Sequence, residues 1–157
     1  MQFPQILVYE NDGLLAAMLR ETAKTKRWAL REARKPELCL RLLRAVCPTV
    51  LVLKIATHAK REAGLPVKEE EEQQRAADRE KEQVQSLELL ARVHETFPET
   101  AMVAAGDAED ASLESLAWDF GASYVLMPPQ SRQMLPDIVV GLMEEAIAKS
   151  HSGVTGK

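Results

Sequence analysis

The most constraining feature of this chain is a regular alternation of short apolar runs with longer segments of helical periodicity. Five of the runs have the length of buried strands. They are residues 5–9, 28–30, 49–53, 100–104 and 124–127. Between and after these runs, apolar residues recur at helical spacing, as in 14–23 and 135–147. This repeated order favours one α/β domain with a parallel sheet, because parallel strands need crossover helices.

The third run is apolar on both faces, which is typical of a central strand covered by helices. For five strands in a chain of 157 residues, the flavodoxin-like order 2-1-3-4-5 is the natural arrangement. Functional residues then belong at the carboxyl ends of the first and third strands, where the strand order reverses. Here these residues are Glu10, Asn11 and Lys54, and Asp12 is placed to cap the helix that follows.

Composition argues against several classes of function. The formal net charge is -4, so no global basic field indicates binding of nucleic acid. No run approaches the roughly 18 apolar residues of a membrane span, and Glu10 comes too early for a signal peptide, so we expect a cytosolic protein. The known zinc, serine-hydrolase and phosphate-loop motifs are missing from the sequence, so we expect neither an enzyme nor a bound metal or cofactor.

The two cysteines, Cys39 and Cys47, flank a predicted helix. Eight helical positions separate them by about 12 Å, which is too far for a disulfide. We therefore expect both to be reduced residues of the core.

The chain resembles the receiver domain of bacterial response regulators in the order and spacing of its segments. The segments that carry the resemblance are ILVYEND, PTVLVLK, SLELLARV, TAMVAAGDAED and GASYVLMPPQSRQML. The match extends over nearly all of the chain except residues 55–85. It implies a CheY-like, doubly wound, five-stranded parallel sheet with order 2-1-3-4-5, formed by a receiver-like domain over residues 1–149. Residues 150–157 are then a flexible tail or linker.

The resemblance also implies a phosphorylation pocket, from which this chain departs. Receivers transfer a phosphoryl group from a histidine kinase to an aspartate at the end of the third strand, with the help of Mg²⁺. The aligned positions in this chain are Glu10, Asn11, Asp12, Lys54, Ala104 and Pro128. Lys54 replaces the phosphoacceptor and cannot form an acyl phosphate. We expect Lys54 to pair with Glu10 or Asp12 in place of the metal ion; the alternative is that it extends into solvent.

A charged insertion at residues 61–85 extends the predicted third helix. Residues 67–83 carry seven acidic and four basic side chains with almost no apolar ones, so they lack a face for the core. Their composition predicts one helix from about Val67 to Thr96, whose first half projects from the domain. Its candidate interaction residues are Glu69, Glu70, Glu71, Glu72, Arg75 and Arg79. The projecting half is either a docking arm or a solvated segment without a partner, and its lack of a heptad seam argues against a coiled coil.

Two further surfaces are candidate interfaces. Residues 1–60 contain 11 Lys and Arg against 5 Asp and Glu, while residues 61–157 contain 9 against 19. The basic side chains cluster around the second strand, at Lys24, Lys26, Arg27, Arg31, Arg34, Lys35, Arg41 and Arg44. This cluster either meets an anionic partner or protects a sheet edge. Receivers also dimerise through the fourth helix, fifth strand and fifth helix, where Trp118 and Val140 are candidate contacts, although core packing explains both equally well.

We therefore expect a phosphorylation-independent pseudo-receiver that acts as an adaptor and binds other signalling proteins. One alternative is the regulatory domain of a larger response regulator with a DNA-binding or enzymatic output domain. Another is a sensor that binds a small ligand in the cleft at the switch point. In each case nucleic-acid binding by this domain itself is not indicated, since few aromatic residues lie among the basic ones.

Overall fold

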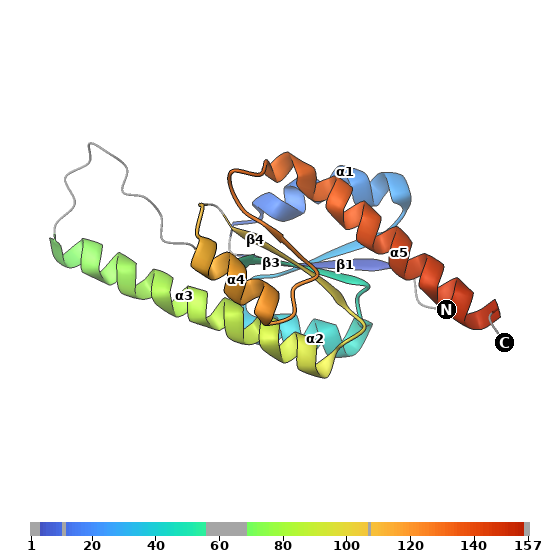
Figure 1. The fold of residues 1–157 in the computed structure, drawn as a ribbon, viewed down its shortest axis with the longest axis horizontal. Helices are drawn as coiled ribbons and strands as arrows, with labels where there is room; N and C mark the ends of the chain where they lie inside the picture. Colours follow the sequence, from blue (N-terminus) through green and yellow to red (C-terminus); the bar gives the residue numbers. More distant parts are fainter. Residues whose placement is uncertain (1–3, 11, 56–68, 107, 156–157) are drawn as a thin grey trace.

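The computed structural model describes residues 4–10, 12–55, 69–106 and 108–155. Within these residues the chain alternates strand and helix, as the sequence predicts (Figure 1). The strands are β1 (Gln5–Tyr9), β2 (Ala29–Ala33), β3 (Val50–Ile55), β4 (Ala101–Gly106) and β5 (Tyr124–Leu126). The helices are α1 (Leu14–Lys26), α2 (Pro36–Val46), α3 (Glu69–Thr96), α4 (Ala111–Asp119), the short 3₁₀ helix η1 (Arg132–Met134) and α5 (Leu135–Thr155).

The described strands form a parallel sheet in the order β2-β1-β3-β4-β5, which confirms the predicted topology. β1 and β3 lie side by side, and their register pairs Tyr9 with Leu53. Glu10 and Lys54 directly follow this pair, so they lie at the same carboxyl edge of the sheet. Because the direction of strand order changes between β1 and β3, this edge is the switch point of the fold.

Helices cover both faces of the sheet, and each face has its own apolar cluster (Figure 1). α1 and α5 cover one face, where Leu19 and Val139 are fully buried. α2, α3 and α4 cover the other face, where Leu43 and Leu90 are fully buried. β3 contributes to both clusters because successive side chains of a strand point to opposite faces.

The second strand extends further than the sequence predicts. It was expected at residues 28–30, whereas β2 runs from Ala29 to Ala33 and includes Arg31 and Glu32. Along its whole length β2 pairs with β1 alone, as an edge strand. Backbone pairing on one side holds the strand although Arg31 is exposed and Glu32 is half-buried, so the apolar pattern understated its length.

α5 continues to Thr155, past residue 150, where the sequence predicts that a flexible tail or linker starts. Within α5, Lys149 Nζ lies 3.1 Å from Glu145 Oε1, and this ion pair between successive turns supports the helix. Gly153 costs a helix only about 1 kcal/mol relative to alanine. A helix already formed over many packed residues extends through such a position. Residues 156 and 157 lie outside the described residues.

α3 is one helix of 28 residues, about 42 Å long at a rise of 1.5 Å per residue. Its amino-terminal half extends beyond the sheet, as predicted, while residues 61–68 lie outside the described residues (Figure 1). Along the described part of α3, Ser86 is the first buried side chain, and Leu89, Leu90 and Val93 follow it into the core. Among the described residues, no helix combines the length and apolar character that a bilayer span requires.

Candidate functional site

Glu10 is the buried carboxylate at the switch point, with a side chain only 2% exposed. Its Oε2 accepts a hydrogen bond of 2.9 Å from the backbone N–H of Leu15, and its Oε1 accepts one of 3.2 Å from that of Ala16. Both donors belong to the first turn of α1, where backbone N–H groups have no partner within the helix. Glu10 therefore caps α1, and its negative charge lies at the positive end of the helix dipole.

The loop between β1 and α1 explains why this distant cap is needed. Gly13 occupies the residue before α1 with φ at +77°, a left-handed conformation that glycine adopts at low cost, and it has no side chain to cap the helix. Asp12 Oδ1 instead accepts a hydrogen bond of 3.1 Å from Leu14 N–H. The predicted capping role of Asp12 is confirmed, and Glu10 completes the cap in a way that the sequence pattern did not reveal.

Lys54 pairs with Asp12 across the switch point. Its Nζ lies 2.6 Å from Asp12 Oδ2, with the two side chains 21% and 36% exposed. The predicted pairing of Lys54 with Glu10 or Asp12 is thus confirmed for Asp12. Partial burial alone would raise the pKa of Asp12, but hydrogen bonds from Lys54 and Leu14, together with the ammonium charge, outweigh it. The pKa of Asp12 therefore lies below its ordinary value.

Ser86 ties α3 to the same edge of the sheet. Its Oγ donates a hydrogen bond of 3.2 Å to the backbone carbonyl of Lys54, and its side chain is buried. The sequence offered one weak signal for this contact, because Ser86 stands where the polar arm gives way to the apolar stripe that starts at Leu87. The hydrogen bond fixes the point where α3 leaves the domain and the projecting half begins.

The other aligned pocket positions lie nearby in the fold. Ala104 is fully buried on β4 and pairs in register with Leu53, one residue before Lys54. It offers no hydroxyl. Pro128 follows β5 and is half-buried, with a cis peptide bond to Pro129. Asn11 lies outside the described residues. The structure thus brings Glu10, Asp12 and Lys54 together at one edge of the sheet.

The projecting half of α3 carries the predicted interaction residues. Glu69, Glu70, Glu71 and Arg75 are exposed. The side chains of Glu72 and Arg79 lie outside the described part of the structure. A side-chain hydrogen bond of 3.1 Å from Gln74 to Asp78 spans one helical turn of this half. The first turn therefore presents at least three glutamates to solvent.

The face formed by α4, β5 and α5 carries the remaining candidates. Trp118 is 45% exposed, and its ring meets that of Tyr124 edge-on, with centroids 6.1 Å apart and an angle of 64°. Val140 is half-buried on α5. Leu116 on α4 and Met134 in η1 are also exposed. Trp118 is therefore accessible to a partner, and Val140 is accessible in part.

Comparison of the sequence with protein-family models and with curated proteins yields no match. Solved structures, in contrast, are similar in fold. A CheY-like response regulator receiver domain protein from Methanospirillum hungatei is 11% identical over 94% of this chain and 99% of its own, with a TM-score of 0.66. The signal receiver domain of a DNA-binding response regulator from Colwellia psychrerythraea is 18% identical over 90% of this chain and 98% of its own, with a TM-score of 0.63.

A third similar structure is NtrX from Brucella abortus, at 16% identity and a TM-score of 0.64. The match covers 98% of this chain but 29% of that one, so the shared part is one portion of a longer protein. At such low identities the likeness establishes the fold. The chain has the receiver fold of response regulators, with Lys54 at the end of its third strand.

Proposed function

We propose that this chain is a pseudo-receiver, a receiver-fold module that binds signalling proteins without accepting a phosphoryl group and without acting as an enzyme. The observation that carries this proposal is the ion pair between Lys54 and Asp12 at the switch point. Phosphoryl transfer to a receiver needs a carboxylate at the end of β3, and Lys54 supplies an ammonium instead.

The described side chains are also a poor fit to the Mg²⁺ ion that receivers use. A hard dication needs free oxygen ligands and an excess of negative charge. Both oxygens of Glu10 accept backbone hydrogen bonds, and Asp12 is neutralised by Lys54. Within the described residues, no group of three or more acidic, histidine or cysteine side chains is placed to hold a metal. These contacts support a pocket whose carboxylates are already paired with protein groups and are not free to bind a metal ion.

Treatment with a small phosphodonor tests the chemical part of the proposal. The intact chain is incubated with acetyl phosphate and Mg²⁺, and its mass is measured under conditions that preserve acyl phosphates. We expect no mass change and no Mg²⁺-dependent shift of NMR signals from Glu10 and Lys54. A stable phosphoryl adduct, or shifts at these residues at millimolar Mg²⁺, would contradict it.

Capture of partners from native lysate tests the binding part. The intact chain is compared with a variant in which residues 62–84 are replaced by a short Gly-Ser loop. A partner that binds only the intact chain assigns recognition to the projecting half of α3. A partner that binds both assigns it to the ordinary receiver surfaces, such as the face around Trp118. If neither protein captures a specific partner, the proposed adaptor role is wrong.

A second candidate function is regulation of an output domain within a larger protein. It is favoured by the likeness to NtrX, in which the matching region is a minor part of the chain. An adaptor binds a separate protein, whereas a regulatory domain contacts an output domain of its own chain. The gene sequence downstream of the codon for Lys157 discriminates between them.

A further inference from the structure

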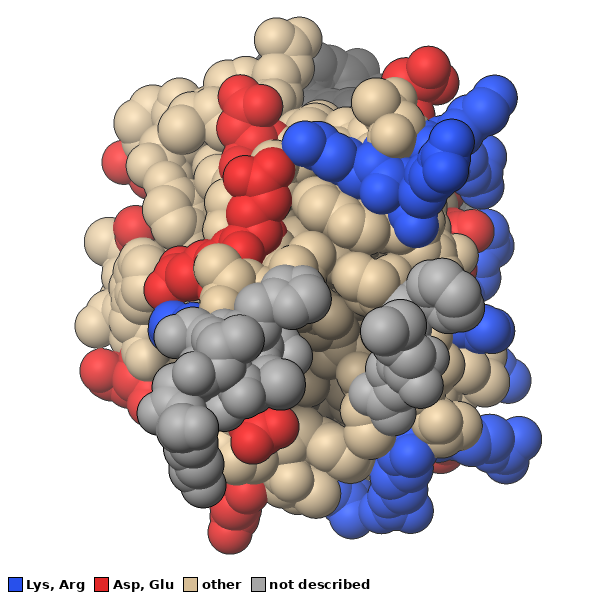
Figure 2. Space-filling model, turned by 90° about the vertical axis from the view of Figure 1, so that its right-hand side faces the viewer, with Lys and Arg blue, Asp and Glu red and all other residues tan. Residues whose placement is uncertain are grey.

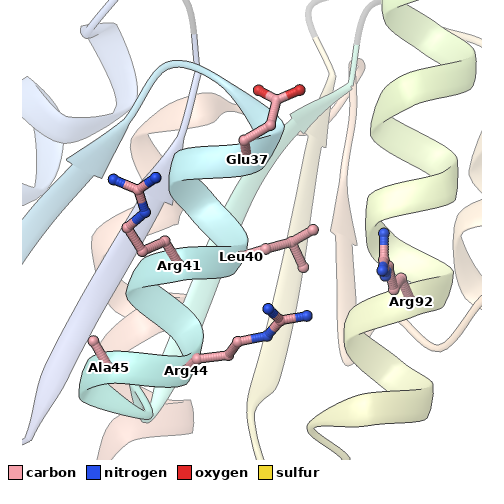
Figure 3. A pocket seen from close by; sticks show the side chains of 6 residues that line it. All are labelled: Glu37, Leu40, Arg41, Arg44, Ala45 and Arg92. Atoms are coloured by element: carbon pink, nitrogen blue, oxygen red, sulfur yellow. The ribbon is translucent and has the colours of Figure 1, made fainter.

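A groove lies between α2 and α3 on the outer surface of the domain (Figure 3). Its volume is about 530 Å³. The lining residues are Glu37, Leu40, Arg41, Arg44, Ala45 and Arg92. Arg44 extends from α2 toward α3, where Arg92 stands on the facing side, and Leu40 points into the space between the two helices (Figure 3). Arg44 and Arg92 thus flank the apolar side chain of Leu40.

The charge of this groove favours an anionic occupant. Three guanidinium groups and one carboxylate line it, and Arg41, Arg44 and Arg92 are all exposed. In the part of the chain that the structure describes, no acidic side chain forms an ion pair with any of the three. Guanidinium groups bind carboxylates through two parallel hydrogen bonds, so they suit glutamate side chains in particular.

The groove belongs to a larger basic surface. The eight basic residues that cluster around β2 in the sequence are all exposed. In the end-on view of Figure 2, Lys and Arg gather mostly along one side of the molecule, and Asp and Glu form a band on the other. Residues 61–157 contain 9 Lys and Arg against 19 Asp and Glu, so another copy of the same chain offers complementary charge.

One face of α3 has the pattern that such a contact requires. Glu70, Ala77, Val84 and Arg92 follow one another at intervals of 7, 7 and 8 residues, which keeps them on one side of a helix. All four are exposed, and Val84 is 47% exposed. Lys81 and Glu88 are exposed on the same face, so the stripe is acidic at the projecting end, mixed in the middle, and basic where it borders the groove. In an antiparallel copy, the acidic end of each stripe meets the basic end of the other.

The distances agree with a two-fold symmetric arrangement. The 22 residues from Glu70 to Arg92 span about 33 Å of helix. If a two-fold axis passes beside residue 81, Glu70 of each copy lies level with Arg92 of the other. The same axis brings Ala77 and Val84 of the two copies together. A single contact surface is then used twice, as in most symmetric dimers.

We infer that the groove between α2 and α3 binds the glutamate-rich first turn of α3 from a second copy of this chain, giving an antiparallel homodimer. The contact pairs Glu70 and Glu71 of one copy with Arg44 and Arg92 of the other, and it buries Val84 near the symmetry axis. This inference does not depend on the proposed pseudo-receiver function, because none of its residues belongs to the switch point.

Sedimentation analysis of the full chain tests the inference directly. At low ionic strength and about 100 µM protein we expect a dimer, and at about 0.5 M salt we expect its Kd to rise at least about tenfold, because the contacts are exposed charges. A wild-type chain that stays monomeric at low ionic strength would overturn the inference. If such a monomer binds an acidic peptide, the groove recognises a different partner.

Charge-reversal variants then identify the surfaces that form the dimer contact. A groove variant, Arg44→Glu with Arg92→Glu, and an arm variant, Glu70→Lys with Glu71→Lys, are each expected to be monomeric. When the two are mixed, the reversed groove meets the reversed arm and the native groove meets the native arm, so the dimer returns. Because recovery requires folded partners, it separates lost binding from lost folding.

A matched control changes net charge equally outside both the groove and the basic surface around β2, through Arg20→Glu with Lys149→Glu. Both positions are exposed and neither lines the groove. This control is expected to keep the wild-type Kd within about threefold, since screened charges away from the contact contribute little. Dimers of the groove variant, a mixture that stays monomeric, or equal weakening by the control would each overturn the inference.

Discussion

Lys54 and Asp12 lie on opposite sides of the switch point and are joined by a contact of 2.6 Å between Nζ and Oδ2. The pair couples the end of β3 to the loop that leads into α1. Asp12 is at the same time hydrogen-bonded to Leu14, so the lysine charge acts on the residue that begins the helix. A change at Lys54 is therefore transmitted to the start of α1 through one carboxylate.

Removal of the lysine charge should raise the pKa of Asp12. In a Lys54→Met variant the hydrogen bond and the ammonium charge that lower this pKa are both lost, while the side chain keeps a similar length. We expect the pKa of Asp12, followed by NMR titration, to move up toward or above its ordinary value. Lys26→Met removes a different exposed lysine and serves as the control, with no expected change at Asp12.

The Lys54→Met variant also tests how the ion pair makes the stability of the protein depend on pH. Because the pKa of Asp12 is lowered in the folded state, the pair stabilises the protein above the ordinary pKa of an aspartate. This contribution is lost as pH falls through the folded-state pKa. The pair is partly exposed, so we expect Lys54→Met to cost less than about 1 kcal/mol at neutral pH. An equal difference between the two proteins in urea denaturation at acidic and neutral pH would contradict this assignment.

Replacement of Glu10 should destabilise the fold more strongly. Glu10→Ala leaves two backbone N–H groups of α1 without their partner at a buried site, so we expect a loss of about 2–3 kcal/mol in the free energy of unfolding. Glu10→Gln retains one acceptor oxygen and should lose about half as much. Both are measured by urea denaturation, with the exposed Glu21→Gln as a control. Wild-type stability of Glu10→Ala would show that the cap is dispensable.

Substitution of Gly121 tests the turn between α4 and β5. Its φ of +107° lies in the region that favours glycine, and a methyl group there would collide with the ring of His94 on α3. We expect Gly121→Ala to lower the free energy of unfolding by at least about 2 kcal/mol. Adding His94→Ala should restore only the part that comes from the collision. Full recovery in the double variant would assign the whole cost to that contact.

The two cysteines should differ sharply in reactivity. Burial raises the pKa of Cys39 to about 12. Cys47 is exposed at the carboxyl end of α2, so the prediction that it lies in the core is wrong. An aromatic disulfide reagent at mildly alkaline pH should titrate one thiol in the folded protein and both in denaturant. Cys47→Ser should abolish the fast phase and Cys39→Ser should leave it. Rapid reaction of both thiols in the native protein would be inconsistent with the buried position of Cys39.

The fold could be predicted because it depends on patterns that are local in sequence. The apolar runs at 5–9 and 49–53 identify β1 and β3, and helical stripes identify their crossovers. Charge also limited the predicted partner of Lys54 to Glu10 or Asp12, since only these two carboxylates were near the end of β1. What could not be predicted depends on backbone geometry. Glu10 reaches α1 only because Gly13 turns the chain through a left-handed conformation.

Most other contacts between separate elements could not be predicted from the sequence. Ser86 carries no periodic signal, yet it binds the carbonyl of Lys54 from 32 residues away. Arg44 and Arg92 lie on different helices, and their positions along the chain do not indicate that they share a groove. In contrast, the length of α3 followed from composition, because a segment rich in Glu, Gln, Arg and Lys favours helix without needing a core. Side-chain encounters between elements require the folded geometry, whereas helix formation does not.

The rate of amide hydrogen exchange should differ between the parts of α3 before and after Ser86. The described side chains at 69–82 are exposed, while Leu89, Leu90 and Val93 are buried against the sheet. We expect backbone amides at 73–85 to exchange at least about tenfold faster than those at 90–96, measured at high salt where the exposed charges are screened. At low salt and high protein concentration, burial of the first half against a second copy should slow its exchange. Uniform protection at high salt would mean that the projecting half packs on the domain, and uniform loss of protection would mean that α3 is not anchored by Ser86.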